Sequence, residues 1–490
     1  MSSQGIPNTG RYSAFRVNPS FKYKLNNAYS ADTLKYCYQC GACSAVCPIS
    51  KFIDAYKPNK IIESVKLGLR GLSQSYAFVF CSACTLCTKG CPQGVKVHEV
   101  MQGLKDISED NPNFVRFLSK GFNDVVEALG QMMPFPITYS WICLLSPEQE
   151  PKEYPFRDIV SKAFHRVLSY NRELGSFEDD AKKVAVIGSG PAGLTAAWEL
   201  ANNGVAVTVF ERQEHPGGML HMGIPGYRLP KDVVEAEIDG IRALGVRIMT
   251  DTPVDRRLFD ELTKSCEYAA VFIATGAGIS RKPGFEGETL SGIATALDFL
   301  KAYNETSGRM EGEKVVVIGG GNVAIDAAGS AMRCGAESVK LFCLEDRVGM
   351  PAHVWEVQEA EAEGVEIHPS RGLHVISGDG EKITGVEVVR CISVFDESGR
   401  FNPTFDEKTI EAVEADRLIF AVGQSPDLSF LSEDIGVSRG AIQSDPYTME
   451  TSVKGVYAGG DAAAGTASLI AAISAGKTAA RSILRYLEIN

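Results

Sequence analysis

The chain has 490 residues, of which 44% are hydrophobic and 22% are charged. This length is enough for about three globular domains. The formal net charge of −12 argues against nucleic acid or an anionic membrane as the main partner.

The N-terminal residues and the cysteines indicate the compartment. Residues 1–24 are polar and lack the apolar core of a signal peptide, and the apolar window 132–145 is too short to span a bilayer. We therefore expect a cytoplasmic protein without a transmembrane segment. Eight of the thirteen cysteines lie between Cys37 and Cys91. Regular spacing in an unsecreted chain indicates metal ligands rather than disulfides.

Two cysteine runs share the pattern C-x2-C-x2-C-x3-C-P, which is typical of proteins with two iron–sulfur clusters. In this pattern three closely spaced thiolates bind one cluster and the fourth thiolate binds the other. Two complete, matching runs disfavour a zinc site, which usually takes its thiolates in pairs. We assign one [4Fe–4S] cluster to Cys37, Cys40, Cys43 and Cys91, and a second to Cys81, Cys84, Cys87 and Cys47.

The stretch from Cys37 to Leu104 resembles the C-type iron–sulfur protein of heterodisulfide reductases and the helical ferredoxin of fumarate reductase iron–sulfur subunits. The resemblance rests on YQCGACSAVCP, NKIIESVKLGL and CSACTLCTKGCPQGVKVHEV. It implies an α-helical two-cluster ferredoxin domain, which we place at residues 1–110. Helical periodicity near 114–129 and 156–174 predicts a helical linker over residues 111–180.

The next segment has the pattern of a dinucleotide-binding βαβ unit. An apolar run from Val184 predicts a strand, and a glycine turn, a helix, a second strand and Glu211 follow. Gly188 allows the tight turn, Gly190 lets a pyrophosphate approach the backbone, and Gly193 lets the helix pack closely. The helix N-terminus favours the phosphates, and the Glu211 carboxylate can accept hydrogen bonds from both ribose hydroxyls.

The sequence HPGGMLHMGIPGYRLPK at 215–231 resembles the flavin-contacting segment of the glutamate synthase small-subunit family. It is also similar to the flavin subunit of the NADH-dependent ferredoxin:NADP oxidoreductases. The resemblance covers residues 184–487 and implies an α/β two-dinucleotide-binding flavoprotein with nested Rossmann-like domains. The cysteine spacing departs from that of the glutamate synthase small subunit. The cofactor-binding residues that the resemblance implies for FAD are Gly188, Gly190, Gly193, Glu211, Gly218, Leu220, Arg228, Gly276, Gly460 and Asp461.

A second strand and a GxGxxA turn with Gly319, Gly321 and Ala324 begin at Lys314. This unit is expected to bind a nicotinamide nucleotide, and strand-rich sequence follows at 382–394 and 412–421. The expected domains are a first FAD-binding part at 181–295, an NAD(P)-binding domain at 296–420 and a second FAD-binding part at 421–490.

The residues after the second strand of this unit predict the coenzyme. They meet the adenosine ribose, where a 2′-phosphate favours arginine and a free hydroxyl favours an acid. NADPH-binding relatives have an aromatic-Arg-Arg run here, whereas this chain has Cys343-Leu344-Glu345. We predict NAD(H) in preference to NADP(H), with Glu345 at the ribose. The alternative is that Glu345 points to solvent and Arg347 binds a phosphate.

These parts predict an NAD(P)H-dependent FAD/iron–sulfur oxidoreductase in which the flavin converts a hydride into single electrons for the clusters. We assign no catalytic acid or base. Because no substrate domain is evident, we expect other redox subunits, or ferredoxin, as partners. The favoured assemblies are an electron-bifurcating transhydrogenase or a heterodisulfide-reductase-like complex. The alternatives are an NADPH-dependent glutamate synthase small subunit and a redox scaffold with an inactive nucleotide site.

A dithiol reductase would need a CxxC or CxxxxC pair beside the flavin, and the sequence from Lys182 to Asn490 has none. The isolated thiols in that range are expected to be buried. They are Cys266, Cys334, Cys343 and Cys391. His215 and His221, near the flavin-contacting segment, are expected to be surface or packing residues.

Overall fold

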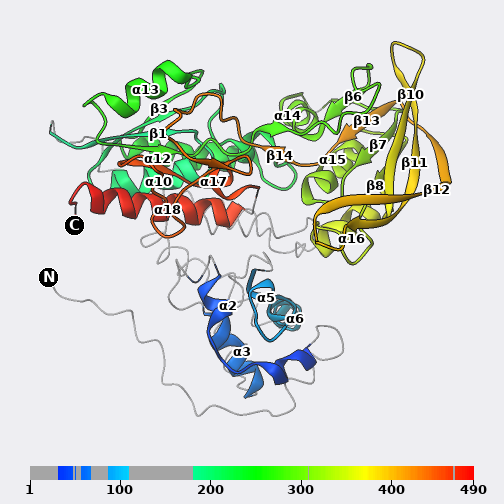
Figure 1. Cartoon of the computed structure of the whole chain (residues 1–490), viewed down its shortest axis with the longest axis horizontal. Coiled ribbons are helices and arrows are strands. Elements are labelled where there is room, and N and C mark those ends of the chain that lie inside the picture. Colours follow the sequence, from blue (N-terminus) through cyan, green and yellow to red (C-terminus); the bar gives the residue numbers. More distant parts are fainter. Residues whose placement is uncertain are drawn as a thin grey trace. The chain divides into compact units, whose positions relative to one another are not determined.

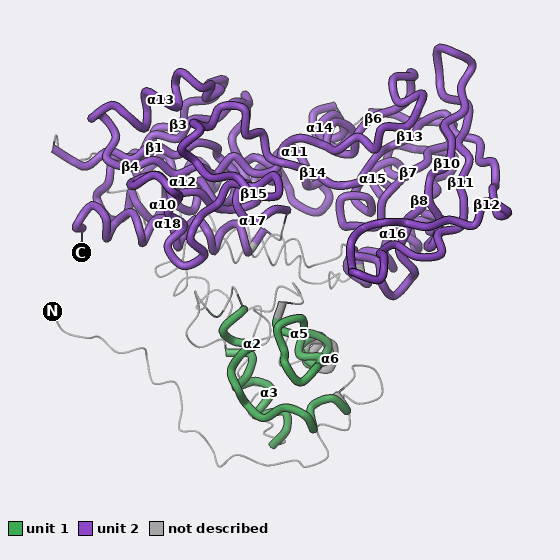
Figure 2. Tube along the Cα trace, viewed as in Figure 1, with its two compact units in different colours: residues 1–144, 151–167 green, residues 145–150, 168–490 purple. Residues whose placement is uncertain are grey.

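The computed structural model describes residues 31–47, 50, 57–67, 86–109, 180–306, 308–466 and 469–489. The chain divides into two compact units (Figure 2). The first unit contains the described residues up to 109, and the second contains those from 180 onward. The helices expected near 114–129 and 156–174 lie outside the described residues.

The described part of the first unit is helical (Figure 1). Ile61, Ile62 and Val65 form the buried stripe of one helix, and Val100, Met101 and Leu104 form that of another. This spacing places each set on one helix face. The elements are η1 (Ala31–Tyr36), α2 (Ala42–Ala45), α3 (Pro58–Lys66), α5 (Leu86–Lys89) and α6 (Val97–Glu109).

The first unit has an internal repeat that the cysteine spacing only partly predicts. Ser44 follows the third cysteine of the first run, and its hydroxyl accepts the backbone N–H of Asn59 at 3.0 Å, in the first turn of α3. Thr88 follows the third cysteine of the second run, and its hydroxyl accepts the N–H of His98 at 3.0 Å, in α6. Each cysteine turn therefore satisfies a free N–H of the helix that packs after it.

The second unit begins with a parallel sheet in the order β17-β4-β1-β2-β3 (Figure 1). Its strands are β1 (Lys183–Ile187), β2 (Ala206–Phe210), β3 (Arg247–Met249), β4 (Ala270–Ile273) and β17 (Val456–Ala458). In register, Ile187 pairs with Phe210 and Ile273, so three strands end level. The last strand, β17, returns to this sheet only after the chain has formed the inserted sheets described below.

Helices cover both faces of this sheet. Helix α10 contacts β1, α12 and α18 on one side, whereas Phe259 and Leu262 of α13 pack into a core with Ile187 and Ile273. No helix among the described residues has the length and apolar run needed to cross a bilayer. The helices are α10 (Pro191–Asn202), α11 (Met219–Met222), α12 (Lys231–Ala243), α13 (Arg256–Lys264), α17 (Asp461–Ala464) and α18 (Leu469–Tyr486).

A second parallel sheet, in the order β6-β13-β7-β8-β9, is inserted between β4 and β17. Helices α14 (Ala296–Thr306), α15 (Asn322–Arg333) and α16 (Val354–Ala362) supply residues to the core on one face. The insertion confirms the nested α/β arrangement. The strands are β6 (Ile293–Thr295), β7 (Lys314–Ile318), β8 (Ser338–Phe342), β9 (Glu366–His368) and β13 (Arg417–Phe420).

An antiparallel sheet of β10 (Arg371–Gly378), β11 (Ile383–Phe395) and β12 (Phe401–Glu414) shares a core with the other face. The strand expected at 412–421 is divided between two sheets. The chain leaves β12 at Glu414, and Asp416 accepts the N–H of Lys314 at 3.0 Å before β13 begins. Two short pairs, β5 (Ile279–Ser280) with β14 (Gln424–Ser425) and β15 (Val437–Ser438) with β16 (Ala441–Ile442), complete the unit.

Candidate redox site

Four cysteines from both runs line one pocket of the first unit. They are Cys37, Cys40, Cys43 and Cys91, the set that the spacing assigns to one cluster. Burial, followed by the neighbouring Cys37, Cys91 and Cys40 sulfurs, raises the pKa of Cys43 to about 11. The free thiols therefore disfavour ionisation, and a bound cationic iron centre would reverse this by stabilising the thiolates. These donors fit a [4Fe–4S] cluster.

The second set of cysteines is described only in part. Cys47 and Cys87 are buried. Cys81 and Cys84 lie outside the described residues. The second cluster therefore stays a prediction.

The glycine turn between β1 and α10 has the geometry of a phosphate cradle. A Cβ on Gly188, whose φ is +99°, would lie 2.5 Å from the carbonyl oxygen of Ala274, and one on Gly193 would lie 2.0 Å from that of Gly188. Neither position accepts a side chain. Gly190 faces open space, with nothing within 4 Å of such a Cβ. A pyrophosphate can approach the backbone there.

Glu211 follows β2 and is buried. One carboxylate oxygen accepts the N–H of Ser189 at 2.9 Å and its hydroxyl at 2.5 Å, and the other accepts the N–H of Gln213 at 2.9 Å. The Ser189 hydroxyl in turn accepts the N–H of Gly217 at 3.0 Å. Glu211 therefore stabilises the glycine turn, a role that the sequence motif did not indicate, and each oxygen retains capacity for a ribose hydroxyl.

The remaining residues expected at the flavin approach the same turn from other segments. A Cβ on Gly218 would lie 3.0 Å from Cα of Gly190, and one on Gly460, which follows β17, would lie 3.1 Å from Cβ of Ala192. Asp461 begins α17, Leu220 is fully buried, and Gly276 has a φ of +66° in the turn after β4. The carboxyl ends of β1, β4 and β17 thus converge on one place, where ligands bind in open α/β sheets.

Arg228 lies at the junction between the two nucleotide-binding halves. Its Nε is 2.5 Å from Oδ1 of Asp326 on α15, and its Nη1 is 3.0 Å from Oε2 of Glu359 on α16. Burial and the nearby Asp326 raise the pKa of Glu356 to about 8. Sequence reasoning missed this cluster, because Arg228 and its partners are far apart along the chain. The flavin contact of Arg228 stays a prediction.

The second glycine turn repeats the geometry of the first. A Cβ on Gly319, whose φ is +143°, would lie 2.4 Å from the carbonyl oxygen of Ala421. Gly321, like Gly190, has nothing within 4 Å of such a Cβ, and Ala324 is fully buried where the helix packs on the sheet. The backbone at Gly321 is therefore open to a second dinucleotide.

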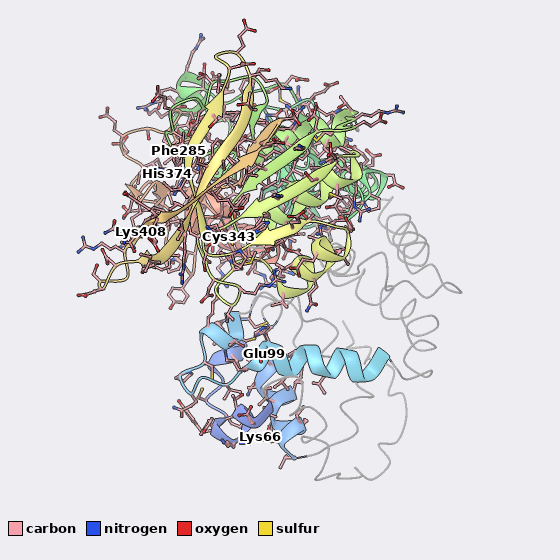
Figure 3. The ribbon with its side chains drawn as sticks, turned by 90° about the vertical axis from the view of Figure 1, so that its right-hand side faces the viewer. Lys66, Glu99, Phe285, Cys343, His374 and Lys408 are labelled. Carbon is pink, nitrogen blue, oxygen red and sulfur yellow. The ribbon has the colours of Figure 1, made fainter. Side chains whose placement is uncertain are left out.

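Glu345 lies over this turn. Its Oε2 is 2.9 Å from the position of a Cβ on Gly320. Arg347 makes an ion pair with Glu361 of α16. Cys343, labelled in Figure 3 just beyond β8, is buried, and burial raises the pKa of its thiol to about 12. The carboxylate, rather than the arginine, is directed at the nucleotide turn.

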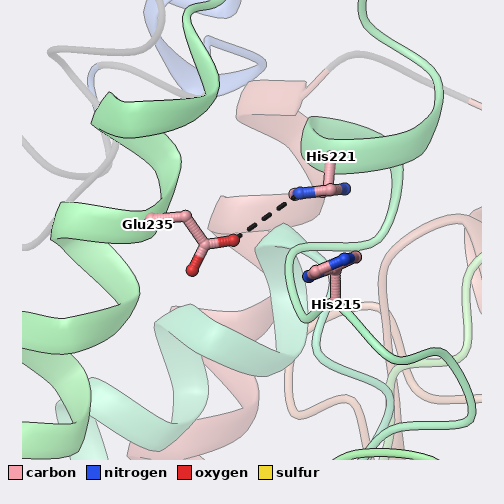
Figure 4. Close-up of side chains that lie close together, drawn as sticks. All are labelled: His215, His221 and Glu235. Carbon is pink, nitrogen blue, oxygen red and sulfur yellow. Dashed lines mark ion pairs between the residues drawn. The ribbon is translucent and has the colours of Figure 1, made fainter. Parts of the chain in front are cut away.

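His215 and His221 stack on each other beside the Gly217–Gly218 loop (Figure 4). Their ring centroids are 4.6 Å apart at 17°, and Nε2 of His221 lies 3.6 Å from Oε1 of Glu235. Nitrogen lone pairs lie in the ring plane, so nearly parallel rings do not direct them at one ion. Burial lowers the pKa of His221. The arrangement is a packing contact, as expected.

The isolated thiols differ from the expectation in one case. Cys334, Cys343 and Cys391 are buried, whereas Cys266 is exposed. The expectation was wrong for Cys266, because this residue follows the end of α13 at Ser265 rather than lying on an apolar face.

Comparisons with known proteins match both units. Residues 182–476 match the family described as pyridine nucleotide-disulphide oxidoreductase, and residues 33–95 match a 4Fe-4S dicluster domain. The NADP(+)-dependent formate dehydrogenase subunit beta of Moorella thermoacetica is 44% identical over 313 residues. The aligned region is 63% of this chain but only 44% of that relative.

Two further proteins extend the comparison. The glutamate synthase [NADPH] small chain of Escherichia coli is 31% identical over 462 residues, covering 88% of this chain and 96% of that relative. Mycobacterium tuberculosis FprA in complex with NADPH superposes with a TM-score of 0.52 at 19% identity, covering 63% of this chain and 85% of FprA. That likeness supports the fold of the second unit.

Proposed function

Because the chain belongs to the pyridine nucleotide-disulphide oxidoreductase family and aligns along most of its length with a glutamate synthase small chain, we propose that it transfers electrons between a nicotinamide coenzyme and partner redox subunits. FAD would bind the first glycine turn, NAD(H) the second, and two [4Fe–4S] clusters the first unit. The observation that carries the proposal is the pocket formed by Cys37, Cys40, Cys43 and Cys91. Spacing alone predicted this set across two distant runs.

The chemistry comes from the cofactors: FAD exchanges a hydride with the nicotinamide and single electrons with iron–sulfur clusters. The chain binds and orients them. Gly190 and Gly321 leave the backbone open for two pyrophosphates, and α10 and α15 direct free N–H groups at them. Asp461 begins α17 beside the first turn, where it is placed to accept a hydrogen bond from the flavin's ribityl chain. No side chain is proposed as a proton donor or acceptor.

For the coenzyme we propose NAD(H). Glu345 is directed at the turn, and its carboxylate would repel a 2′-phosphate but accept hydrogen bonds from a ribose diol. Arg347, which would otherwise be available to a phosphate, is paired with Glu361. The proposal departs from the relatives reported above, whose names specify NADP(+) or NADPH.

The partners would be other redox subunits, in an electron-bifurcating transhydrogenase or a heterodisulfide-reductase-like complex. The name of the Moorella relative describes a subunit, and the described residues here form no further domain that could hold an organic substrate. Affinity capture of the full chain under anaerobic conditions, followed by mass spectrometry, tests this. Recovery of the chain alone, with full cofactor content, would contradict it.

A second candidate is the small chain of a glutamate synthase, which the 88% coverage by the Escherichia coli relative favours. The two candidates predict different partners. A glutamate synthase would co-purify with a large amidotransferase subunit and form glutamate from glutamine and 2-oxoglutarate with NADPH. A redox complex would co-purify with other metal-containing subunits and form none.

Anaerobic rapid mixing of the purified chain with NADH tests the electron transfer itself. Loss of the flavin absorbance within the mixing experiment, followed by loss of the cluster absorbance, is the expected result. A flavin that stays oxidised with both NADH and NADPH would instead support the scaffold with an inactive nucleotide site.

A further inference from the structure

The repeat in the first unit is not symmetric at the residue before the second cysteine of each run. The first run reads Cys37-Tyr-Gln-Cys40 and the second reads Cys81-Ser-Ala-Cys84. Gln39 therefore corresponds to Ala83, which has no side-chain donor. The repeat is otherwise close, since Ser44 and Thr88 cap α3 and α6 in the same way.

The side chain of Gln39 is directed at a predicted cluster ligand. Its Nε2 donates a hydrogen bond to Sγ of Cys37 at 3.3 Å. The other amide atom, Oε1, is buried and has no hydrogen-bond partner in the described residues. An amide whose acceptor half is left unsatisfied contributes through its donor. The N–H···S contact is the contribution that the side chain makes here.

The backbone at Gln39 is strained. Its φ is +62°, in the left-handed region that glycine favours. Asn and Asp are enriched there and glutamine is not. A non-glycine residue in that region costs free energy, and such residues persist at functional sites. The strained position holds the amide against the Cys37 sulfur.

Two other contacts at this pocket are less specific. The backbone N–H of Val95 donates to Sγ of Cys91 at 3.4 Å. Lys66, labelled in Figure 3 on α3, donates to the carbonyl oxygen of Cys37 at 2.6 Å. The repeat aligns Lys66 with Lys105, so a lysine is present in both halves of the sequence. Of these side chains, only Gln39 has no polar counterpart.

A donor to a ligand sulfur stabilises the reduced cluster more than the oxidised one, because reduction adds a negative charge that the sulfurs share. We propose that Gln39 raises the reduction potential of the cluster held by Cys37, Cys40, Cys43 and Cys91 above that of the second cluster. Electrons would then collect on the first cluster. This inference rests on the proposed function, because it requires both clusters.

The test is an anaerobic redox titration of the full chain, followed by electron paramagnetic resonance, on the wild type and Gln39→Gly. Glycine removes the donor and relieves the positive φ, so the fold is retained. We expect the equilibrium of one cluster to shift about threefold to tenfold toward the oxidised form, about 28 to 59 mV. The other cluster should not move.

Three further variants separate hydrogen bonding from structure. Gln39→Glu replaces the donor with a carboxylate, so its potential should lie below that of Gln39→Gly. Gln93→Ala removes an amide that lines the same pocket without a hydrogen bond to a cysteine sulfur among the described contacts, and should leave both potentials unchanged. Ala83→Gln should raise the potential of the other cluster.

The outcomes are distinguishable from failure of the proposed function. Zinc in place of iron in the wild type would reject the clusters themselves. Normal iron content with no shift in Gln39→Gly, with equal shifts of both clusters, or with a shift as large in Gln93→Ala, would overturn only the role of Gln39.

Discussion

Neutralising Glu345 should reverse the coenzyme preference. Its Oε2 lies 2.9 Å from the position of a Cβ on Gly320, so an adenosine ribose bound at this turn would contact the carboxylate. Two unit charges 4 Å apart interact by about 4 kcal/mol at an effective dielectric constant of 20 and by about 1 kcal/mol in water. Glu345 is half-buried. We therefore take a repulsion of about 2 kcal/mol for a 2′-phosphate.

In Glu345→Gln, this repulsion is lost and the KM for NADPH should fall about 30-fold. The KM for NADH should rise about tenfold, because charge-assisted hydrogen bonds to the diol become neutral ones. The kcat should change little, since uniform binding is altered. Steady-state kinetics with each coenzyme and a one-electron dye measures all three values.

Arg347→Gln is the matched control. Its side chain is paired with Glu361, so both KM values should stay within about twofold of the wild type. A KM for NADPH that rises tenfold or more in this variant would mean that Arg347 binds the phosphate. A wild type that prefers NADPH, together with no change in Glu345→Gln, would refute the reasoning.

Three predictions concern the domain junction and the clusters. Arg228→Met leaves buried carboxylates unpaired and should lower the free energy of unfolding in urea by about 3 to 5 kcal/mol, whereas a loss below about 1 kcal/mol would mean that the cluster is not coupled to folding. The pKa of Glu356 is raised to about 8, so the folded chain binds the extra proton and stability falls as pH rises from about 5 to 8; Glu356→Gln should flatten this fall, which is at most about 1.4 kcal/mol per pH unit, and parallel wild-type and variant curves would contradict it. Cys91→Ser should remove the cluster of the first run, lowering iron by about four atoms, and should eliminate the signal that shifts in Gln39→Gly; loss of the other signal would contradict the crossed assignment.

The sequence predicted features whose cause is local. The glycines at 188, 193 and 319 are required because a Cβ there would overlap a nearby carbonyl oxygen, and a short motif records that requirement. The crossed cysteine set was predictable because its spacing matches a known ligation pattern.

Contacts between distant residues left no such signal. Arg228 meets Asp326 and Glu359 across 98 and 131 residues, so nothing near Arg228 indicates its partners. The hydrogen bonds from Ser189 to Glu211 depend on how the first turn folds against β2. The bounds of the individual domains, the second cluster and the residues at each cofactor stay predictions.

The central claim is that one chain joins a nicotinamide site, a flavin and two clusters in a single electron pathway. Anaerobic reduction of the purified full chain by substoichiometric NADH, read by flavin absorbance and by the paramagnetic signals of the clusters, tests it most directly. The account predicts that NADH electrons appear on the cluster of Cys37, Cys40, Cys43 and Cys91 first. A flavin that is reduced while both clusters stay oxidised, in a sample with about eight irons, would contradict it.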